Sequence, residues 1–381
     1  MAAAFYWLLY LGLSAAFVAY HYRHSQSYRP QAWPQLPPPQ WPDDAPLLSV
    51  LVPAWNAAED IAPFVTAFHA LPYPRKELLL CVGGRDGSLA QAQAQAQPGQ
   101  VIVLEQQPGE GKQGGLAKCF AASQGEIIYL TDIDCRMDAT SLQRVLEPLL
   151  QGKEAVVTGS SRPHDAQLRH GAVAVHWALV RKAEGRQGSY VSGILGRNCA
   201  VTRAAVEAIN GFAFAAPTGT DYRMAQALSE QGYAIWREPT SEIATEYAWP
   251  LRSYIRKRGR WVRNILLYAQ RPRQNAEFFN ALSVALLPLA MLLALLLSAL
   301  LSLFTPLALA YVPAFVVLLL LAHGTLQRLY YLRETLSDVQ AVSACSLSWK
   351  LRGAGLNWLA QLAAGLYALT TWLVPSLRKR W

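Results

Sequence analysis

Short apolar runs alternate with longer helical patterns in the middle of the chain. Apolar runs of strand length lie at residues 47–52, 77–82, 101–104 and 126–130. Apolar residues with helical spacing fill the intervals at residues 57–71 and 113–123. We expect Pro53 to end the first strand and the Gln- and Ala-rich tract at residues 91–97 to be helix surface or loop. Strands and helices that alternate at this spacing predict an α/β domain with a mostly parallel sheet and right-handed crossovers.

Four longer runs without a charged residue lie outside this middle part. They span residues 1–20, 281–304, 306–322 and 354–374. Each approaches the roughly 20 residues that a membrane-spanning helix needs, and four of them exceed what one soluble core can bury. Basic residues follow the first run instead of preceding it, which favours an uncleaved anchor with an outside N-terminus over a cleavable signal peptide. The sequence therefore predicts an integral membrane protein.

The four runs do not give a consistent topology. If the N-terminus is outside, four crossings also leave the basic tail outside, against the tendency of basic residues to stay in the cytoplasm. Three alternatives remain open: the run at residues 354–374 lies in the membrane interface, the run at residues 306–322 does not cross fully, or the tendency is broken.

These patterns divide the chain into six parts. They are an anchor at residues 1–22, a Pro-rich linker at 23–46, a catalytic α/β domain at 47–250, basic amphipathic interface helices at 251–280, C-terminal transmembrane helices at 281–375 and a basic tail at 376–381.

Composition and charge fit this division. Hydrophobic residues make up 52% of the chain and charged residues 15%, which disfavours a wholly soluble protein. The net charge of +9 could suggest a nucleic-acid partner, but much of it gathers in one place just before the long apolar run. The basic residues of that stretch are Arg252, Arg256, Lys257, Arg258, Arg260, Arg263, Arg271 and Arg273. Because aromatic and aliphatic residues alternate with them, we expect an amphipathic stretch on anionic headgroups and no nucleic-acid partner. A flank that merely follows the positive-inside tendency explains part of the charge as well.

Five cysteines are scattered singly, at Cys81, Cys119, Cys135, Cys199 and Cys345. Their spacing fits neither a metal site nor a pairing pattern, so we interpret them as reduced cytoplasmic thiols.

Ligands of open parallel sheets bind beyond the carboxyl ends of the strands, and candidate chemistry follows three of the expected strands. A glycine-rich turn with Asp86 follows the second strand, although such a turn can also be purely structural. Lys112 follows the third strand in a flexible turn above the sheet, where it could bind a phosphate. Asp132 and Asp134 follow the fourth strand and could hold Mg²⁺ or Mn²⁺, which typically bridges substrate phosphates.

Three further candidates, at two places, lie closer to the C-terminus. Asp221 precedes a helical pattern at residues 224–231, where it could be a general base or only the N-cap of that helix. In the basic stretch, Arg260 could stabilise a diphosphate and Trp261 could form the wall of an acceptor pocket.

Taken in order, these motifs resemble family 2 glycosyltransferases of the GT-A fold, and the likeness runs from about residue 47 to residue 261. The matching segments are residues 49–56, the turn at 85–88, residues 111–116, Asp132 and Asp134, residues 196–203 with 211–212, Asp221, and residues 257–261. The resemblance implies that Pro53, Asp86, Lys112, Asp132 and Lys257 bind the donor. It also implies that Asp134 and Asp132 hold the metal ion, and that Asp221, Arg260 and Trp261 act in catalysis.

The sequence departs from the family pattern at three positions. Arg85 replaces an acidic residue of the uridine turn, Thr220 replaces a glutamate before the base, and Lys257 replaces a glutamine. The change at Thr220 puts the tuning of Asp221 in doubt, but not the base itself.

The resemblance implies an inverting transfer of a sugar from a UDP-sugar to a hydroxyl of a membrane lipid, as in ceramide and carotenoid glycosyltransferases. It also implies a place in a bacterial cytoplasmic membrane, with the catalytic domain in the cytoplasm. A processive polysaccharide synthase is the alternative, although such enzymes usually have more spanning helices. A non-catalytic membrane scaffold that kept the fold is a further alternative, which the joint retention of Asp132, Asp134 and Asp221 argues against.

Overall fold

The computed structural model describes residues 2–25, 40–42, 44–185, 188–214, 219–269, 275–336, 345–374 and 376–377. Most of the predicted linker at residues 23–46 lies outside this set. The chain divides into two compact units, which we call the sheet unit and the helix unit. The sheet unit comprises Trp33–His164 and Ala183–Tyr247, and the helix unit comprises Met1–Ala32, Asp165–Lys182 and Ala248–Trp381. Each is described by itself below.

The sheet unit is built on seven strands in the order β3-β2-β1-β4-β6-β5-β7. The strands are β1 (Leu48–Trp55), β2 (Lys76–Gly83), β3 (Val101–Glu105), β4 (Ile127–Leu130), β5 (Val156–Pro163), β6 (Cys199–Thr202) and β7 (Trp236–Thr245). Neighbours among β1 to β4 pair in parallel, as do β5 and β7, while β6 is antiparallel to both β4 and β5. The predicted α/β class and mostly parallel sheet are confirmed, and the antiparallel strand β6 is an addition to the prediction.

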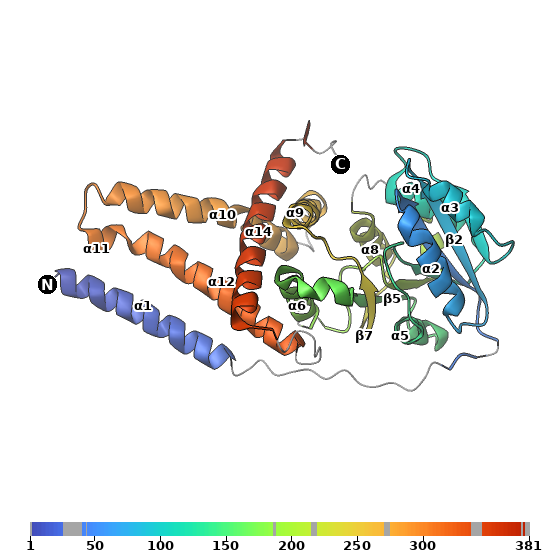
Figure 1. Cartoon of the computed structure of the whole chain (residues 1–381), viewed down its shortest axis with the longest axis horizontal. Helices are drawn as coiled ribbons and strands as arrows, with labels where there is room; N and C mark the ends of the chain where they lie inside the picture. Colours follow the sequence, from blue (N-terminus) through green and yellow to red (C-terminus); the bar gives the residue numbers. More distant parts are fainter. Residues whose placement is uncertain are drawn as a thin grey trace. The chain divides into compact units, whose positions relative to one another are not determined.

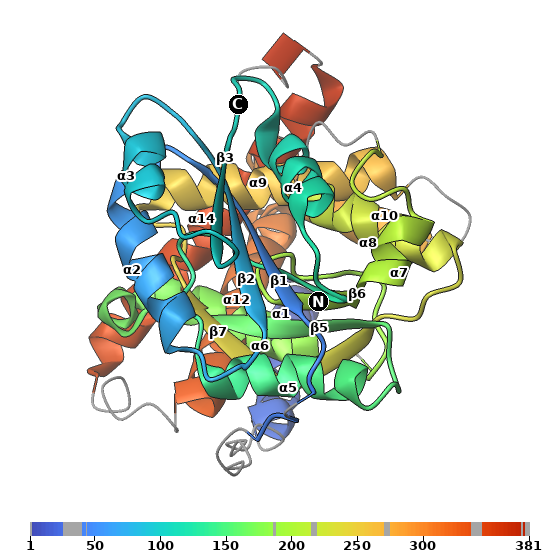
Figure 2. The ribbon, with the colours of Figure 1, turned by 90° about the vertical axis from the view of Figure 1, so that its right-hand side faces the viewer.

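Helices cover both faces of this sheet. They are α2 (Ala58–Ala70), α3 (Ser88–Ala94), α4 (Gly111–Ala122), α5 (Ala139–Leu150), α7 (Arg203–Ala208) and α8 (Thr220–Glu230). One core packs α2, α3 and α5 against Val50 and Val52 of β1, and the other packs α4, α7 and α8 against Leu51. Figure 2 shows α2 and α3 on one side of β1 and β2 and α4 and α8 on the other. Because both faces are covered, the central strands β1, β2 and β4 are buried over most of their length and read as continuous apolar runs.

The prediction that Pro53 ends the first strand is wrong, because β1 continues to Trp55. The pairing of β1 with β4 stops at Leu51, whose carbonyl accepts from Thr131 on that side. Residue 53 lies on the same side as Leu51, since hydrogen-bonding groups alternate along a strand. The missing N–H of Pro53 therefore removes no ladder bond, and the strand tolerates the proline.

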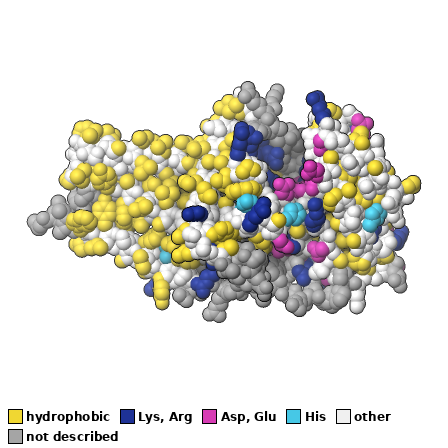
Figure 3. Space-filling model, viewed as in Figure 1, with side chains coloured by type: hydrophobic (Ala, Val, Ile, Leu, Met, Phe, Trp, Pro, Cys, Tyr) yellow, Lys and Arg dark blue, Asp and Glu magenta, His cyan; other side chains and the backbone are white. Residues whose placement is uncertain are grey.

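The helix unit contains the predicted apolar segments. Its elements are α1 (Ala2–Ser25), η1 (Asp165–Arg169), most of α6 (Gly171–Gly185), α9 (Leu251–Tyr268), α10 (Asn275–Leu301), α11 (Leu307–Ala310), α12 (Val312–Leu336) and α14 (Leu347–Leu373). Among the described residues, two stretches are long and apolar enough to cross a membrane by length and composition, α10 and Val312–Thr335 within α12. The sequence suggested four such runs, and neither α1 nor α14 is among the two. Large hydrophobic side chains cover the face of α10 and α12 seen in Figure 3.

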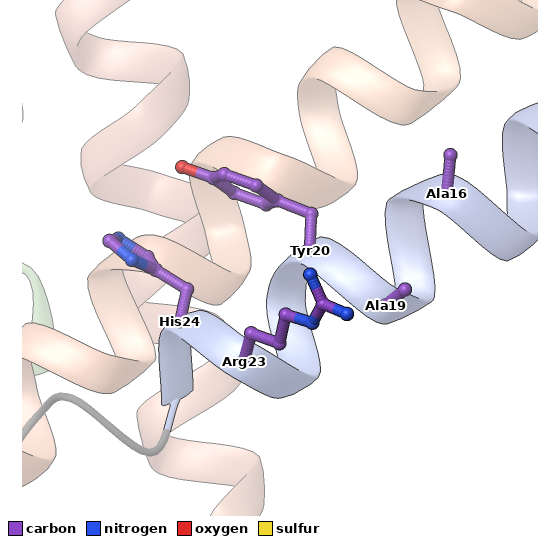
Figure 4. Close-up of a pocket in the computed structure, with 5 residues that line it drawn as sticks. All are labelled: Ala16, Ala19, Tyr20, Arg23 and His24. Atoms are coloured by element: carbon purple, nitrogen blue, oxygen red, sulfur yellow. The ribbon is translucent and has the colours of Figure 1, made fainter.

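Within the helix unit, α1, α10 and α12 run alongside one another and α14 runs across them (Figure 1). The contacts that join α1 to α12 include a hydrogen bond of 3.1 Å between the rings of His21 and His323 and the packing of Tyr10 on Phe315. Residue numbers rise together in these pairs, so α1 and α12 run in the same direction. The last turns of α1 carry Tyr20, Arg23 and His24 beside the small residues Ala16 and Ala19, which together line a recess (Figure 4).

The predicted basic stretch is a single helix, α9, in the part of the chain that the structure describes, and residues 270–274 lie outside it. Arg263 was expected to face anionic headgroups. It is only 1% exposed, so that expectation is wrong for this residue, because it lies on the packed face of α9 with Val262 and Leu266.

Candidate active site

The carboxyl ends of β1, β2 and β4 meet at one edge of the sheet, because the three strands are parallel neighbours. Beyond β1 and β2, the turn that follows β2 is held by Asn56, whose Oδ1 accepts from the Arg85 amide at 2.8 Å. Gly84 has a φ of 125°, and a Cβ there would lie 2.3 Å from that same amide oxygen. This position of the turn therefore requires glycine.

Asp86 lies in that turn with an exposed carboxylate. The Ser88 hydroxyl donates to Asp86 Oδ1, and the Ala58 amide donates to Oδ2 at 3.0 Å. These two hydrogen bonds, with Ser88 the stronger cause, hold the pKa of Asp86 below its ordinary value. The carboxylate is thus charged at neutral pH and fixed in direction, yet it keeps lone pairs for a further donor.

Lys112 joins two candidate residues that are far apart in the sequence. Its Nζ lies 2.8 Å from Oδ1 of Asp132 and 3.4 Å from Oδ1 of Asp221. Burial by itself would lower the pKa of Lys112, but the two carboxylates outweigh burial and raise the pKa. The prediction that Lys112 lies in a flexible turn is wrong, because Lys112 is in the first turn of α4. The helix therefore fixes the backbone from which the Lys112 side chain extends.

Pro53 lies beneath this helix. A Cβ on Gly115 would come within 2.9 Å of Pro53 Cβ, so the close approach of α4 to β1 depends on a glycine facing a proline. Pro53 therefore helps to set the position of α4, and with it that of Lys112.

Asp221 is in the first turn of α8, but it is not the N-cap of that helix. Gly219 is the N-cap, with a φ of 78°, so the capping alternative for Asp221 is wrong. The Asp221 carboxylate instead packs against the backbone of Gly196, where a Cβ would lie 2.2 Å from Oδ1. Because Gly196 has no side chain, the Asp221 carboxylate has room to contact Lys112.

Asp134 is held from two sides within the sheet unit. The Thr245 hydroxyl donates to Asp134 Oδ1 at 3.3 Å, and the His164 ring donates to the Asp134 backbone carbonyl at 3.1 Å. These contacts come from β7 and from the residue after β5. The segment with Asp134 is thus tied to the far half of the sheet.

Arg197 adds a second cation beside the carboxylates. Burial lowers its pKa, but the nearby Asp132, together with Tyr247, Cys135 and Asp134, raises it overall. The same carboxylates act on the Cys135 thiol, where burial, Asp132 and Asp134 raise the pKa to about 11. Sequence reasoning assigned no role to Arg197, His164 or Thr245, and only the segment containing Arg197 had been noted as a motif.

The residues present fit a divalent cation of the magnesium or manganese type. Among the described residues no group of three or more His, Cys, Asp or Glu could hold a metal ion, so a fully protein-built cage is absent from that part of the chain. Asp132 and Asp134 offer carboxylate oxygens only, and Asp132 already forms a salt bridge with the ammonium of Lys112. One or two carboxylates completed by substrate phosphates and water are the usual surroundings of Mg²⁺.

Lys257, Arg260 and Trp261 lie on α9 in the helix unit. Trp261 is 56% exposed, and the Arg258 guanidinium lies 5.8 Å from its ring centre. Gly259 is buried against Tyr367 of α14, so α9 and α14 are in close contact at this turn. The roles of these three α9 residues at the carboxylates remain a prediction.

Two solved structures that resemble this chain are glycosyltransferases. The mannosyltransferase PcManGT from Pyrobaculum calidifontis, in complex with GDP-Man and Mn²⁺, is 19% identical, with a TM-score of 0.51 over 97% of this chain and 99% of that one. At this identity the likeness establishes the fold alone. Glucosyl-3-phosphoglycerate synthase from Mycobacterium tuberculosis, in complex with Mn²⁺, UDP and its product, is 18% identical, with a TM-score of 0.41 over 62% of this chain and 86% of that one.

No curated protein matches the sequence of the chain at a significant level. A family model does match it, over residues 49–208, which hold Asp86, Lys112, Asp132 and Asp134. Its description is glycosyl transferase family 2. Residues 49–208 therefore match the model of family 2 glycosyltransferases, and the chain has the GT-A fold.

Proposed function

We propose that this protein is a membrane-bound, inverting glycosyltransferase that moves a sugar from a UDP-sugar to a hydroxyl of a membrane lipid. The observation that carries this proposal is the convergence of Asp132 and Asp221 on the single ammonium of Lys112. The three residues come from three separate segments of the chain, and together they supply a base, a cation and a metal ligand at one edge of the sheet.

Asp221 is the general base in this proposal. Its carboxylate takes the proton of the acceptor hydroxyl as that oxygen forms a bond to the anomeric carbon. At the same time the bond from the anomeric carbon to the diphosphate oxygen breaks, and the diphosphate leaves with the electron pair. A single displacement of this kind inverts the configuration at the anomeric carbon.

Lys112 and Arg197 stabilise the negative charge that develops on the diphosphate. Both side chains are protonated at neutral pH, since the neighbouring carboxylates raise both pKa values. Fixed cations that face developing charge are among the strongest contributions to catalysis. A divalent cation held by Asp134 and Asp132 would supply further neutralisation of the same diphosphate.

Donor recognition in this proposal uses Asp86 and Pro53 on the sheet unit and Lys257 on α9. The rigid, charged Asp86 carboxylate can accept from the N–H of a uracil ring. Arg260 adds positive charge at the diphosphate and Trp261 forms one wall of the acceptor pocket. The exposed ring of Trp261 is consistent with an apolar acceptor.

A lipid acceptor is supported by the helix unit. Two helices are apolar enough to cross a membrane, and large hydrophobic side chains remain exposed on α10 and α12. A hydroxyl-bearing lipid would stay in the bilayer that surrounds these helices.

The test is to incubate membranes that contain the protein with labelled UDP-sugars and either Mn²⁺ or Mg²⁺, and with GDP-mannose as the comparison donor. Membranes with the Asp221→Asn variant are the matched control. We expect label from a UDP-sugar in the organic extract with the native protein only. Label in high-mass polymer would instead support a polysaccharide synthase, label from GDP-mannose alone would overturn the donor assignment, and equal label in the control would overturn the role of Asp221.

A further inference from the structure

We propose that α14 lies in the plane of the membrane interface and does not cross the bilayer. The proposal rests on the membrane location proposed above, but not on the donor or the acceptor. It commits this helix to one partner, the boundary between lipid headgroups and acyl chains.

The first observation is the direction of α14 within the helix unit. It runs across α10 and α12, the two helices that are long and apolar enough to span (Figure 1). Close backbone approaches fix this crossing on two sides. A Cβ on Gly365 would lie 2.6 Å from the Val284 carbonyl of α10, and a Cβ on Gly324 of α12 would lie 2.7 Å from the ring of Trp358.

The second observation is the level at which α14 crosses. Between Val284, where Gly365 packs, and Leu301 at the end of α10, the helix extends about 25 Å at 1.5 Å per residue. The hydrocarbon core of a bilayer is about 30 Å thick. If the turn between α10 and α12 reaches one face of the membrane, α14 therefore lies close to the other face.

The third observation is a group of polar contacts at the same level. The Arg328 guanidinium of α12 donates to Asn357 at 3.0 Å and to Gln361 on α14, and to the Gly324 carbonyl at 2.8 Å. A charged side chain is costly at the centre of a bilayer and much less so near the interface. On α1, which runs parallel to α12, His21 lies against His323, and Arg23 and His24 follow directly in the last turns of α1 (Figure 4).

The fourth observation is a stripe of exposed leucines along one side of α14. Its members are Leu351, Leu359, Leu366 and Leu373, which are 44%, 60%, 38% and 62% exposed. Their spacing of seven or eight residues returns to one side of a helix. The opposite side is packed with small residues, among them Gly353, Ala364 and Ala368. Lipid acyl chains can cover these exposed leucines, as they can the exposed leucines of α10 and α12.

This arrangement also allows a consistent membrane topology, which four crossings did not. If α1 crosses as its uncharged run predicts, together with α10 and α12, and α14 lies in the interface, the chain crosses three times. An outside N-terminus then leaves the C-terminus inside, and the basic tail at residues 376–381 obeys the positive-inside tendency.

The test measures depth along the helix in the full-length protein. Single cysteines replace the four stripe leucines of α14, one at a time, in a Cys345→Ser background. The matched control series is Leu286→Cys, Leu293→Cys and Leu300→Cys on α10, which are also exposed. Each cysteine carries an environment-sensitive fluorophore in vesicles whose lipids bear a nitroxide at the headgroup, high on the acyl chain or near its end.

We expect all four α14 positions to be quenched most strongly by the same shallow nitroxide. Over the roughly 21 Å of α10 between its labelled positions, quenching should instead be deep at Leu293 and shallow at Leu286 and Leu300, which lie near opposite faces. Over the same α14 positions a spanning helix would extend about 33 Å, so deep quenching at Leu359 and Leu366 with shallow quenching at the ends would overturn the proposal. Absence of quenching along α14 alone would also overturn it, since the helix would then be in water.

Absence of quenching along α10 as well would defeat the membrane location itself, which separates that failure from failure of the present inference. A second measurement does not depend on the labelled variants. An epitope fused after Trp381 should be digested by protease added to inside-out vesicles and protected in right-side-out vesicles, and the reverse pattern would contradict three crossings.

Discussion

The Asp221 carboxylate occupies the space that a side chain at residue 196 would fill, with its Oδ1 2.2 Å from the Cβ position of Gly196. We therefore predict that Gly196→Ala displaces the base without removing it. A displacement of about 1 Å can lower turnover by roughly 10²-fold. The measurement is steady-state transfer together with UDP affinity, which should remain near native.

Gly193→Ala is the matched control, because no atom lies within 4 Å of a Cβ at that position of the same segment. It should transfer sugar at close to the native rate. Equal activity of the two alanine variants would mean that the position of Asp221 does not matter for transfer.

A second prediction concerns the chemical role of Asp221. Since Gly219 is the N-cap, Asp221→Asn should leave the cap of α8 intact and change thermal stability little. The amide cannot accept a proton, so turnover should fall by roughly 10² to 10⁴. Transfer rate, melting temperature and UDP affinity measure the three parts of this expectation.

Glu242→Gln and Glu246→Gln are the comparison for Asp221→Asn, because these carboxylates are the next candidates for a base along the chain. Normal turnover in Asp221→Asn together with a large loss in either glutamine variant would move the base to that residue.

Lys112 shows which part of this site the sequence predicts. The motif identified the residue, but the local pattern predicted a turn where α4 already begins at Gly111. Helix boundaries depend on weak local preferences that tertiary packing easily overrides. The salt bridge to Asp221 spans more than a hundred residues of sequence, and no local pattern encodes such a contact.

The residues that sequence reasoning missed show the same limit. Arg197, His164 and Thr245 have no distinctive spacing, and they reach Asp132 or Asp134 only because β5, β6 and β7 form one sheet. Strand periodicity did predict the parallel half of that sheet, since buried strands are continuous apolar runs. The buried position of Arg263 depends on which side of α9 packs, and a stretch rich in basic residues all round does not reveal that side.

A third prediction separates Lys112 from the other lysine of its helix. Lys112→Met should lower transfer by roughly 10² to 10³, the usual loss when one stabilising donor is removed from an active site. Lys118→Met is the matched control on α4, since Lys118 pairs with Glu110 at 2.6 Å. It should keep most of the activity, and a comparable loss in both variants would point to damage of the helix.

The pH dependence of the Lys112 contribution follows from the sign of its pKa shift. Its pKa is raised in the folded protein, so its contribution to stability is fully present below the ordinary value of about 10.4 and is lost only as the pH rises through the raised pKa. An acid limb in the pH profile of transfer therefore reflects another group, and it should still be present in the residual activity of Lys112→Met.

A fourth prediction concerns the metal. Asp134→Ala should abolish transfer in a folded protein, and a chelator should do the same to the native protein. Asp138→Ala is the control, because Asp138 caps α5 through the Ser141 amide at 2.9 Å. That change should cost about 1 kcal/mol of stability but leave transfer measurable at low temperature. Full activity of Asp134→Ala in chelator would rule out a metal-dependent reaction.

A fifth prediction divides the arginines of α9. Arg252→Gln with Arg256→Gln should weaken activity on anionic vesicles more than in neutral detergent, since each charge near such a surface contributes about 1 kcal/mol. Arg263→Gln should instead lower the melting temperature in both media, because Arg263 is buried. Equal losses of the double variant in vesicles and in detergent would place its effect on folding or on the active site.

The salt bridge of Lys112 with Asp132 also has a consequence for how ligands bind to the resting protein. The ammonium and a divalent cation compete for the same carboxylate, so a metal ion alone should bind weakly. A donor diphosphate that attracts Lys112 makes Asp132 available to the metal ion, and because coupling between two ligands is reciprocal, the metal ion tightens the donor by the same factor. The domain would then bind its two ligands tightly only together, and each of them weakly alone. Until both are bound, the Asp221 carboxylate would stay paired with the Lys112 ammonium. Titration of Mn²⁺ with and without UDP measures this cooperativity, which should vanish in Lys112→Met.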